Sequence, residues 1–242
     1  MRQEPFLGPP NKRAATWYYR RVNWTKLNSL FDSPFGIYRH HKKYAEGIDT
    51  APLVEEIKKN EAFWSATRAQ KVAVQRETLN IPLLVARPTS PSIHVDNVQE
   101  VAPSPYFKDF PATLRVLERF AVGRNARISR VNIVSLTPRK PVYSHIDHGL
   151  YYAPRARYHL VVSSKGSIMT NGGQQTFFKE GEIWRYNNKV PHESYNDSDE
   201  RRIHVIFDLL PNSHLGRLKN RLLWIYFNMR PYRFFKHRTV TH

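Results

Sequence analysis

Three side chains in the second half of the chain have the types and order of a metal-ligand set. His145 and Asp147 stand two positions apart, and His192 follows later in the chain. Two imidazoles and one carboxylate form the facial triad that suits non-haem ferrous iron, because half of an octahedral shell stays open for oxygen and a co-substrate. Arg202, ten positions after His192, adds a cation that suits the far end of a dicarboxylate. The pattern predicts a metal-dependent enzyme.

The secondary structure must bring these side chains together. Residues two apart on a β-strand point to the same face of a sheet, so a strand would let His145 and Asp147 hold one ion. Residues 196–199 have the composition of a turn and lie midway between His192 and Arg202. This spacing predicts a hairpin in which these two side chains face each other across adjacent strands.

From residue 127 onward, short β-type runs alternate with turn residues. Many short strands at this spacing are typical of a jelly roll or a related barrel. Arg157 and His159, two apart on one of these strands, could bind an anion or steady the metal-bound acid. Two helices are expected before them, one capped by Thr50 and one that ends near Gly123. The predicted strands cover residues 128–136, 157–163, 166–170, 175–178, 182–186, 192–195 and 202–209.

The length and composition suit one substantial core, because 40% of the 242 residues are hydrophobic. We expect residues 1–80 to form a helical and irregular cover within that domain and residues 81–211 to form the core. Residues 212–242 are expected to form a basic, helical extension. The sequence contains no cysteine, which excludes disulfides, thiolate zinc sites and cysteine nucleophiles.

The net charge of +18 is concentrated at the two ends. Residues 1–43 hold nine basic and two acidic side chains, and residues 212–242 hold seven basic and no acidic ones. Such ends attract phosphates, anionic lipid or an acidic polypeptide, and they equally suit arms that only solubilise the protein. Neither a secretory signal nor a run of about 20 apolar residues is present, so we expect a soluble, cytoplasmic protein.

Two further basic segments have a structural interpretation. The run His40-His41-Lys42-Lys43 is interpreted as a solvated basic patch rather than a ligand cluster. The C-terminal tail is expected to form a helix that packs on the core, although residues 221–233 could instead lie in an anionic lipid interface. The predicted packing residues are Leu218, Leu222, Ile225 and Met229.

Four motifs, in this order, make residues 128–210 resemble the aspartyl/asparaginyl β-hydroxylase family. They are His145-Ile146-Asp147-His148-Gly149-Leu150, then Arg157-Tyr158-His159-Leu160, then Gly181-Glu182-Ile183-Trp184-Arg185-Tyr186-Asn187-Asn188, and finally His192-Glu193 with Arg202-Ile203-His204-Val205-Ile206-Phe207-Asp208. The family consists of iron(II)- and 2-oxoglutarate-dependent oxygenases. The resemblance therefore implies a mainly β protein with accessory helices and a double-stranded β-helix core, the cupin-like form of the jelly roll.

The resemblance also implies roles for individual residues. His145, Asp147 and His192 would bind Fe(II), and Arg202 would bind the co-substrate 2-oxoglutarate, with oxygen as the other reactant. Arg157 and His159 match the Arg-x-His pair that contacts 2-oxoglutarate. Vertebrate peptide hydroxylases of the family have glycine where Asp147 stands, so this chain is similar to the bacterial and viral branch, which has the complete triad.

Three functions remain open at this point. The family default is hydroxylation of an unactivated carbon, at the β-carbon of Asp or Asn in a peptide or protein, and the basic ends suit an acidic chain. A membrane-surface acyl-chain hydroxylase is the first alternative, because some relatives act on lipids. The second is a non-catalytic, cupin-like module that binds nucleic acid through basic and aromatic segments such as residues 17–21 and 232–236.

Overall fold

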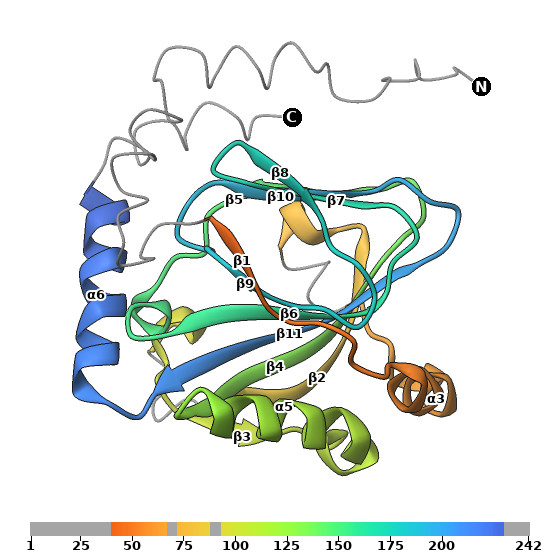
Figure 1. Cartoon of the computed structure of the whole chain (residues 1–242), viewed down its shortest axis with the longest axis horizontal. Helices are drawn as coiled ribbons and strands as arrows, with labels where there is room; N and C mark the ends of the chain where they lie inside the picture. Colours follow the sequence, from red (N-terminus) through yellow and green to blue (C-terminus); the bar gives the residue numbers. More distant parts are fainter. Residues whose placement is uncertain (1–39, 67–71, 88–92, 230–242) are drawn as a thin grey trace. The chain divides into compact units, whose positions relative to one another are not determined.

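Two antiparallel β-sheets face each other in the computed structural model, which describes residues 40–66, 72–87 and 93–229 (Figure 1). The larger sheet has the strand order β1-β9-β6-β11-β4-β2-β3, and the smaller sheet has the order β5-β10-β7-β8. The strands of the larger sheet are β1 (His41–Ala45), β2 (Thr78–Ala86), β3 (Val101–Pro103), β4 (Ala126–Leu136), β6 (Ala156–Ser163), β9 (Ile183–Tyr186) and β11 (Arg202–Pro211). Those of the smaller sheet are β5 (Pro141–His145), β7 (Ser167–Asn171), β8 (Gln174–Phe177) and β10 (His192–Asn196).

The chain passes back and forth between the two sheets from β4 to β11. Strands β4, β6, β9 and β11 lie in the larger sheet, and β5, β7, β8 and β10 lie in the smaller one. This arrangement of eight strands is the double-stranded β-helix form of the jelly roll. The predicted fold class is therefore confirmed. Each predicted strand is present with bounds shifted by one or two residues, whereas β1, β2, β3 and β5 lie outside the predicted runs.

The α-helices of the described residues are α3 (Ala51–Lys59), α5 (Pro111–Gly123) and α6 (His214–Met229). Short 3-10 helices are η1 (Glu61–Phe63), η2 (Ala73–Gln75), η3 (Val95–Asn97), η4 (Phe107–Asp109) and η5 (Leu150–Tyr152). Thr50 is the N-cap residue of α3, and α5 ends at Gly123, as the sequence predicts. The carboxylate of Glu56 on α3 accepts hydrogen bonds from the backbone N–H groups of Ala112 and Thr113. It thereby caps α5 and joins the two helices.

The two faces of β11 have different environments, because successive side chains on a strand alternate. Val205, Phe207 and Leu209 belong to the main hydrophobic core, which the larger sheet forms with α3 and α5 on its outer face (Figure 1). Ile206 and Asp208 point the other way and line a pocket between the sheets. Burial of the apolar face on the helices therefore directs the polar face of β11 into the interior of the jelly roll.

The sequence predicts that the core starts at residue 81, but the larger sheet contains strands from before this residue. Strand β1 pairs with β9, and β2 begins at Thr78. The interpretation of residues 40–43 as solvated is wrong for the histidines, because His40 is buried and the ring of His41 packs edge-on against Phe178. Burial, together with the nearby His40, lowers the pKa of His41 to about 4. Predictions that concern residues 1–39 and 230–242 lie outside the described residues.

Helix α6 packs through a different face from the predicted one. Its buried residues are Asn220, Leu223 and Phe227, and the Asn220 side chain donates a hydrogen bond to the carbonyl of Pro154. Three of the four side chains expected to pack on the core are instead exposed, namely Leu218 (52%), Leu222 (57%) and Ile225 (42%). The side chain of the fourth, Met229, lies outside the described ones. The sequence carries apolar residues on two stripes of this helix, so periodicity alone selects neither. Among the described helices, none combines the length and the apolar character needed to cross a bilayer.

Candidate active site

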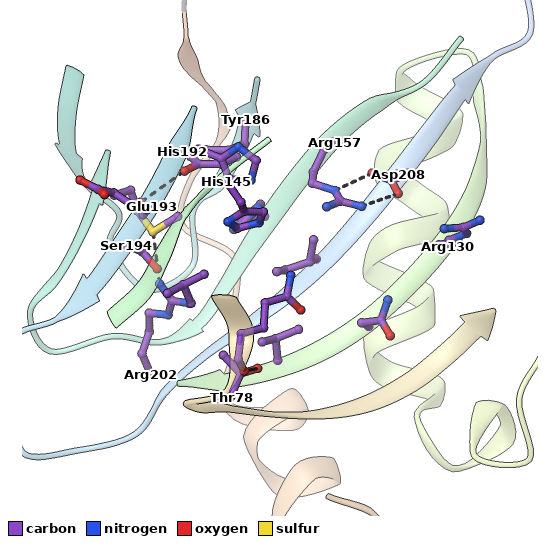
Figure 2. Close-up of a pocket in the computed structure, with 17 residues that line it drawn as sticks. Thr78, Arg130, His145, Arg157, Tyr186, His192, Glu193, Ser194, Arg202 and Asp208 are labelled. Carbon is purple, nitrogen blue, oxygen red and sulfur yellow. Dashed lines mark hydrogen bonds and ion pairs between the residues drawn. The ribbon is translucent and has the colours of Figure 1, made fainter. Parts of the chain in front are cut away.

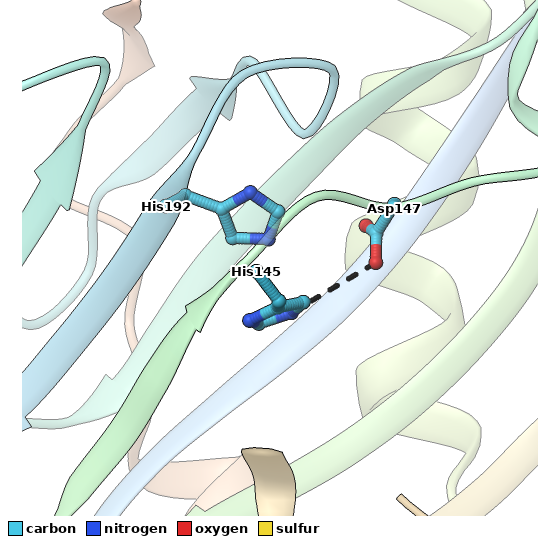
Figure 3. A group of neighbouring side chains, drawn as sticks. All are labelled: His145, Asp147 and His192. Atoms are coloured by element: carbon cyan, nitrogen blue, oxygen red, sulfur yellow. Dashed lines mark ion pairs between the residues drawn. The ribbon is translucent and has the colours of Figure 1, made fainter. Parts of the chain in front are cut away.

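The three predicted metal ligands converge in the structure (Figure 3). One ligand atom from each of His145, Asp147 and His192 lies within 4.8 Å of the others. His145 is the last residue of β5 and His192 the first residue of β10, and the two are register partners in the antiparallel pair of these strands. Asp147 lies beyond the end of β5, so the expected placement of His145 and Asp147 on one strand is wrong. A short loop brings the carboxylate to the histidines.

Backbone carbonyls orient both imidazoles. His145 Nδ1 lies 2.7 Å from the carbonyl of Tyr143, and His192 Nδ1 lies 2.9 Å from the carbonyl of Val190. Because a carbonyl oxygen only accepts, each Nδ1 carries the hydrogen and each Nε2 keeps its lone pair for a metal. Burial, followed by the effect of His145, lowers the pKa of His192 to about 3. The ring of His192 is therefore neutral at physiological pH, as a metal ligand must be.

Two hydrogen bonds hold one oxygen of the Asp147 carboxylate. Arg157 Nη1 and Asn188 Nδ2 both donate to Oδ2, the latter over 3.1 Å. The other oxygen, Oδ1, faces His145 and lies 3.9 Å from its Nε2. The backbone N–H of Asp147 also donates to the carbonyl of Asn188. These contacts fix the orientation of the carboxylate and direct Oδ1 to the two histidines.

Arg202 is a buried cation without an acidic partner among the described residues. It is only 2% exposed, and its Nη1 contacts the Ser167 hydroxyl at 3.2 Å and the Met169 sulfur at 3.3 Å. Its Nε has no hydrogen-bond partner within the part of the chain that the structure covers. Burial lowers the pKa of Arg202 to about 10, which leaves the guanidinium charged at neutral pH. A buried charge in this state is costly unless an anion pairs with it.

The predicted hairpin between His192 and Arg202 is wrong. Strand β10 pairs with β5 and β7, and β11 pairs with β4 and β6. His192 and Arg202 therefore come from opposite sheets, and both line the pocket between them (Figure 2). Residues 196–199 carry the chain from one sheet to the other. Both side chains reach this pocket through the packing of the two sheets, and not across a hairpin.

Arg157 and His159 line the same pocket from β6. Arg157 is placed between the carboxylates of Asp147 and Asp208. Burial alone would lower the pKa of Arg157, but the charges of Asp147 and Asp208 raise it well above its usual value. His159 Nδ1 lies 3.3 Å from His204 Nδ1, and burial, then Arg157, keeps the pKa of His159 well below its usual value. The cation of Arg157 is thus neutralised by carboxylates, and that of Arg202 is not.

Several residues of this site, among them Asp208, have no role that the sequence predicts. One signal for Asp208 was present. Asp208 lies an even number of positions after Arg202 on a predicted strand, so the two side chains share one face of the sheet. Apolar and polar groups complete the pocket, whose lining residues are Gln75, Thr78, Arg130, Asn132, Val134, Val142, His145, Arg157, His159, Met169, Tyr186, His192, Glu193, Ser194, Arg202, Ile206 and Asp208.

The burial of Lys189, which follows Asn188 of this site, predicts that the stability of the protein depends on pH. The side chain is buried, its Nζ donates to the carbonyl of Arg155, and burial followed by the charge of Arg185 lowers its pKa to about 7. Between pH 10.5, the ordinary lysine value, and pH 7, the unfolded chain binds a proton that the folded chain lacks. Folded-state stability therefore falls as the pH decreases through this window, by about 1.4 kcal/mol per unit.

Lys189→Met should remove this dependence. Urea unfolding at pH 7 and pH 9 measures it, and the stability of wild type relative to the variant should rise by about 2 kcal/mol at the higher pH. Lys165→Met, at an exposed lysine, is the matched control and should show no comparable change. An equal difference at both pH values for Lys189→Met would contradict the prediction.

A family model and several solved structures are similar to this chain. Residues 92–211 match the sequence model of the aspartyl/asparaginyl beta-hydroxylase family. A comparison with curated proteins finds no significant match. Among solved structures, a prolyl-4-hydroxylase from Pseudomonas putida is similar, with 12% identity, a TM-score of 0.44 and coverage of 77% of this chain and all of the other. HygX from Streptomyces hygroscopicus, solved with nickel, 2-oxoglutarate and hygromycin B, has 12% identity, a TM-score of 0.46 and coverage of 79% and 88%.

The family match spans the segment that carries the metal triad, from β5 through β10, and Arg202 on β11. The facial set of two histidines and one carboxylate is the ligand set that iron(II) oxygenases use. Residues 92–211 are therefore similar to the aspartyl/asparaginyl β-hydroxylase family, and they carry the facial ligand set that iron(II)- and 2-oxoglutarate-dependent oxygenases use.

Proposed function

We propose that this oxygenase hydroxylates an unactivated carbon in an Asp or Asn residue of a peptide or protein. One observation carries the assignment of the co-substrate: Arg202 is a buried cation without an acidic partner among the described residues, in the pocket that His145 and His192 also line. A dicarboxylate that chelates a metal at one end and pairs with Arg202 at the other would satisfy this charge.

The residues fit iron(II) and 2-oxoglutarate. His145 and His192 offer Nε2 lone pairs, and Asp147 offers Oδ1, so a metal here would have three protein ligands and open positions. The far carboxylate of 2-oxoglutarate would bind Arg202 and the Ser167 hydroxyl. When bound, iron and 2-oxoglutarate supply the oxidising power for hydroxylation, with conversion of 2-oxoglutarate to succinate and carbon dioxide.

The remaining walls of the pocket position the substrate and limit water. Val134, Val142 and Ile206 provide apolar surface, which restricts water around the reacting centre. The amides of Gln75 and Asn132 and the cation of Arg130 also face the pocket. Amides suit the peptide backbone and the side chain of Asn, and a cation suits the carboxylate of Asp. These groups support a peptide substrate over an acyl chain.

Turnover of defined peptides tests the substrate class. The full chain, supplied with Fe(II), 2-oxoglutarate and oxygen, should add one oxygen atom to peptides that contain Asp or Asn, and mass spectrometry with fragmentation should locate it on that residue. Succinate should form in equal amount. His192→Ala is the inactive control. If no peptide of a broad library gains oxygen while acyl-chain lipids do, the proposed substrate class is wrong and the lipid alternative is correct.

A further inference from the structure

A buried chain of charged and polar groups lies behind the metal carboxylate. Asp147, Arg157, Asp208 and Tyr151 are all buried. Asp208 binds Arg157 in a bidentate pair, because Nε donates to Oδ1 and Nη2 donates to Oδ2, each over 2.9 Å (Figure 2). The Tyr151 hydroxyl donates to Asp208 Oδ2 over 3.1 Å, and it accepts a hydrogen bond from the backbone N–H of Arg130. The chain therefore runs from the β4 backbone to Asp147.

The geometry of this chain directs Arg157 to Asp147. All three guanidinium nitrogens of Arg157 donate to carboxylate oxygens, two to Asp208 and one to Asp147. A planar guanidinium gripped on two nitrogens by one carboxylate has little rotational freedom. Asp208 thus fixes the plane in which Nη1 of Arg157 meets Oδ2 of Asp147. Oδ1 is left on the side of His145.

We propose that Asp208 is a positioning residue that acts through Arg157 to hold Asp147 as a metal ligand through one oxygen. Arg157 then serves the metal ligand, whereas the family resemblance implies a contact with the co-substrate. The inference rests on the proposed metal site. Groups that orient a metal ligand from behind typically change metal affinity by about 10- to 100-fold when they are replaced.

Metal titration in the absence of 2-oxoglutarate separates the two roles of Arg157. Mn(II) affinity is measured by calorimetry on the full chain, for wild type and for Asp208→Asn, which keeps the shape of the side chain but removes its charge. We expect Asp208→Asn to weaken Mn(II) binding by about 10- to 100-fold. Tyr151→Phe should weaken it in the same direction by less, because the Arg157–Asp208 pair stays intact.

The matched control is Asp199→Asn. Asp199 also forms a two-point pair with an arginine, Arg139, at 3.0 and 3.2 Å, but it is exposed and outside the pocket. This variant should bind Mn(II) as wild type does. Thermal melting of each metal-free variant identifies any that fails to fold, in which case Tyr151→Phe carries the test.

A spectroscopic measurement distinguishes positioning from general support of the fold. At saturating Co(II), the visible absorption bands of Asp208→Asn should differ from those of wild type, because a released Asp147 carboxylate changes its coordination. Unchanged Mn(II) affinity with weakened 2-oxoglutarate binding would overturn the inference and assign Arg157 to the co-substrate. Lower affinity with an unchanged Co(II) spectrum would also overturn it. If wild type binds neither metal, the proposed function itself fails.

Discussion

His192→Ala is expected to abolish turnover by removing one of three metal ligands. The remaining His145 and Asp147 cannot provide a facial set of three ligands. Among the described residues, no other His, Asp or Glu belongs to this cluster. The loss should exceed the roughly 10- to 100-fold effect of changes made behind a metal ligand. Succinate release measures activity, and metal content after anaerobic loading measures binding.

His214→Ala controls for the loss of an imidazole, since His214 is exposed at the start of α6. This variant should retain wild-type activity and metal content. Full metal occupancy in His192→Ala would show that His192 is not a ligand.

Arg202→Met should selectively weaken the binding of 2-oxoglutarate. The guanidinium is buried in the pocket without an acidic partner in the described part of the chain, so the co-substrate carboxylate is its expected counter-ion. Removing one partner of a buried charge pair costs about 2–5 kcal/mol, which corresponds to a loss of affinity of about 30-fold or more. Calorimetric titration of the metal-loaded protein with 2-oxoglutarate measures this change.

Metal affinity distinguishes this effect from damage to the site. Arg202→Met should bind Mn(II) as wild type does, because Arg202 contacts Ser167 and Met169 rather than the ligands. Arg202→Lys should give an intermediate loss, since lysine keeps the charge but lacks the two-pronged geometry. Unchanged 2-oxoglutarate affinity in Arg202→Met would place the far carboxylate elsewhere.

The sequence predicted seven of the strands, and it selected the three residues whose ligand atoms converge, because both depend on local patterns. Alternation of side chains defines the faces of a strand, and the β-type run that contains Arg157 and His159 therefore predicted their common placement in the pocket. The order of chemical types along the chain was sufficient to select His145, Asp147 and His192. The faces of a strand and the order of residue types along the chain do not depend on which strands pair.

Strand partners could not be predicted in the same way. Residues 196–199 have the composition of a hairpin turn, but β10 and β11 join different sheets. Composition specifies that the chain turns, whereas sheet membership depends on contacts with β4 and β6 that are distant in sequence. The prediction of the buried face of helix α6 was wrong for a related reason. The helix has two apolar stripes, and a tertiary contact, at Asn220, lies on the side that packs.

Asp208 shows a third limit. Its position on the pocket face of β11 follows from strand parity, but its role depends on a bidentate pair with Arg157 on the neighbouring β6. The register of β11 against β6, which places Asp208 directly opposite Arg157, is a property of the folded sheet. A sequence pattern that covers one strand at a time contains no information about that register.

The register of β5 against β10 has a consequence for metal loading. His145 and His192 are opposite each other in this pair, and their ring centroids lie 4.2 Å apart, so the backbone ladder sets their spacing. Little of the metal's binding free energy is then spent on folding, unlike in domains that fold only around their ion. The ion would stabilise the chain by mass action alone, by about 2.7 kcal/mol at a hundred times its dissociation constant. We therefore expect chelation to remove the metal without unfolding the jelly roll.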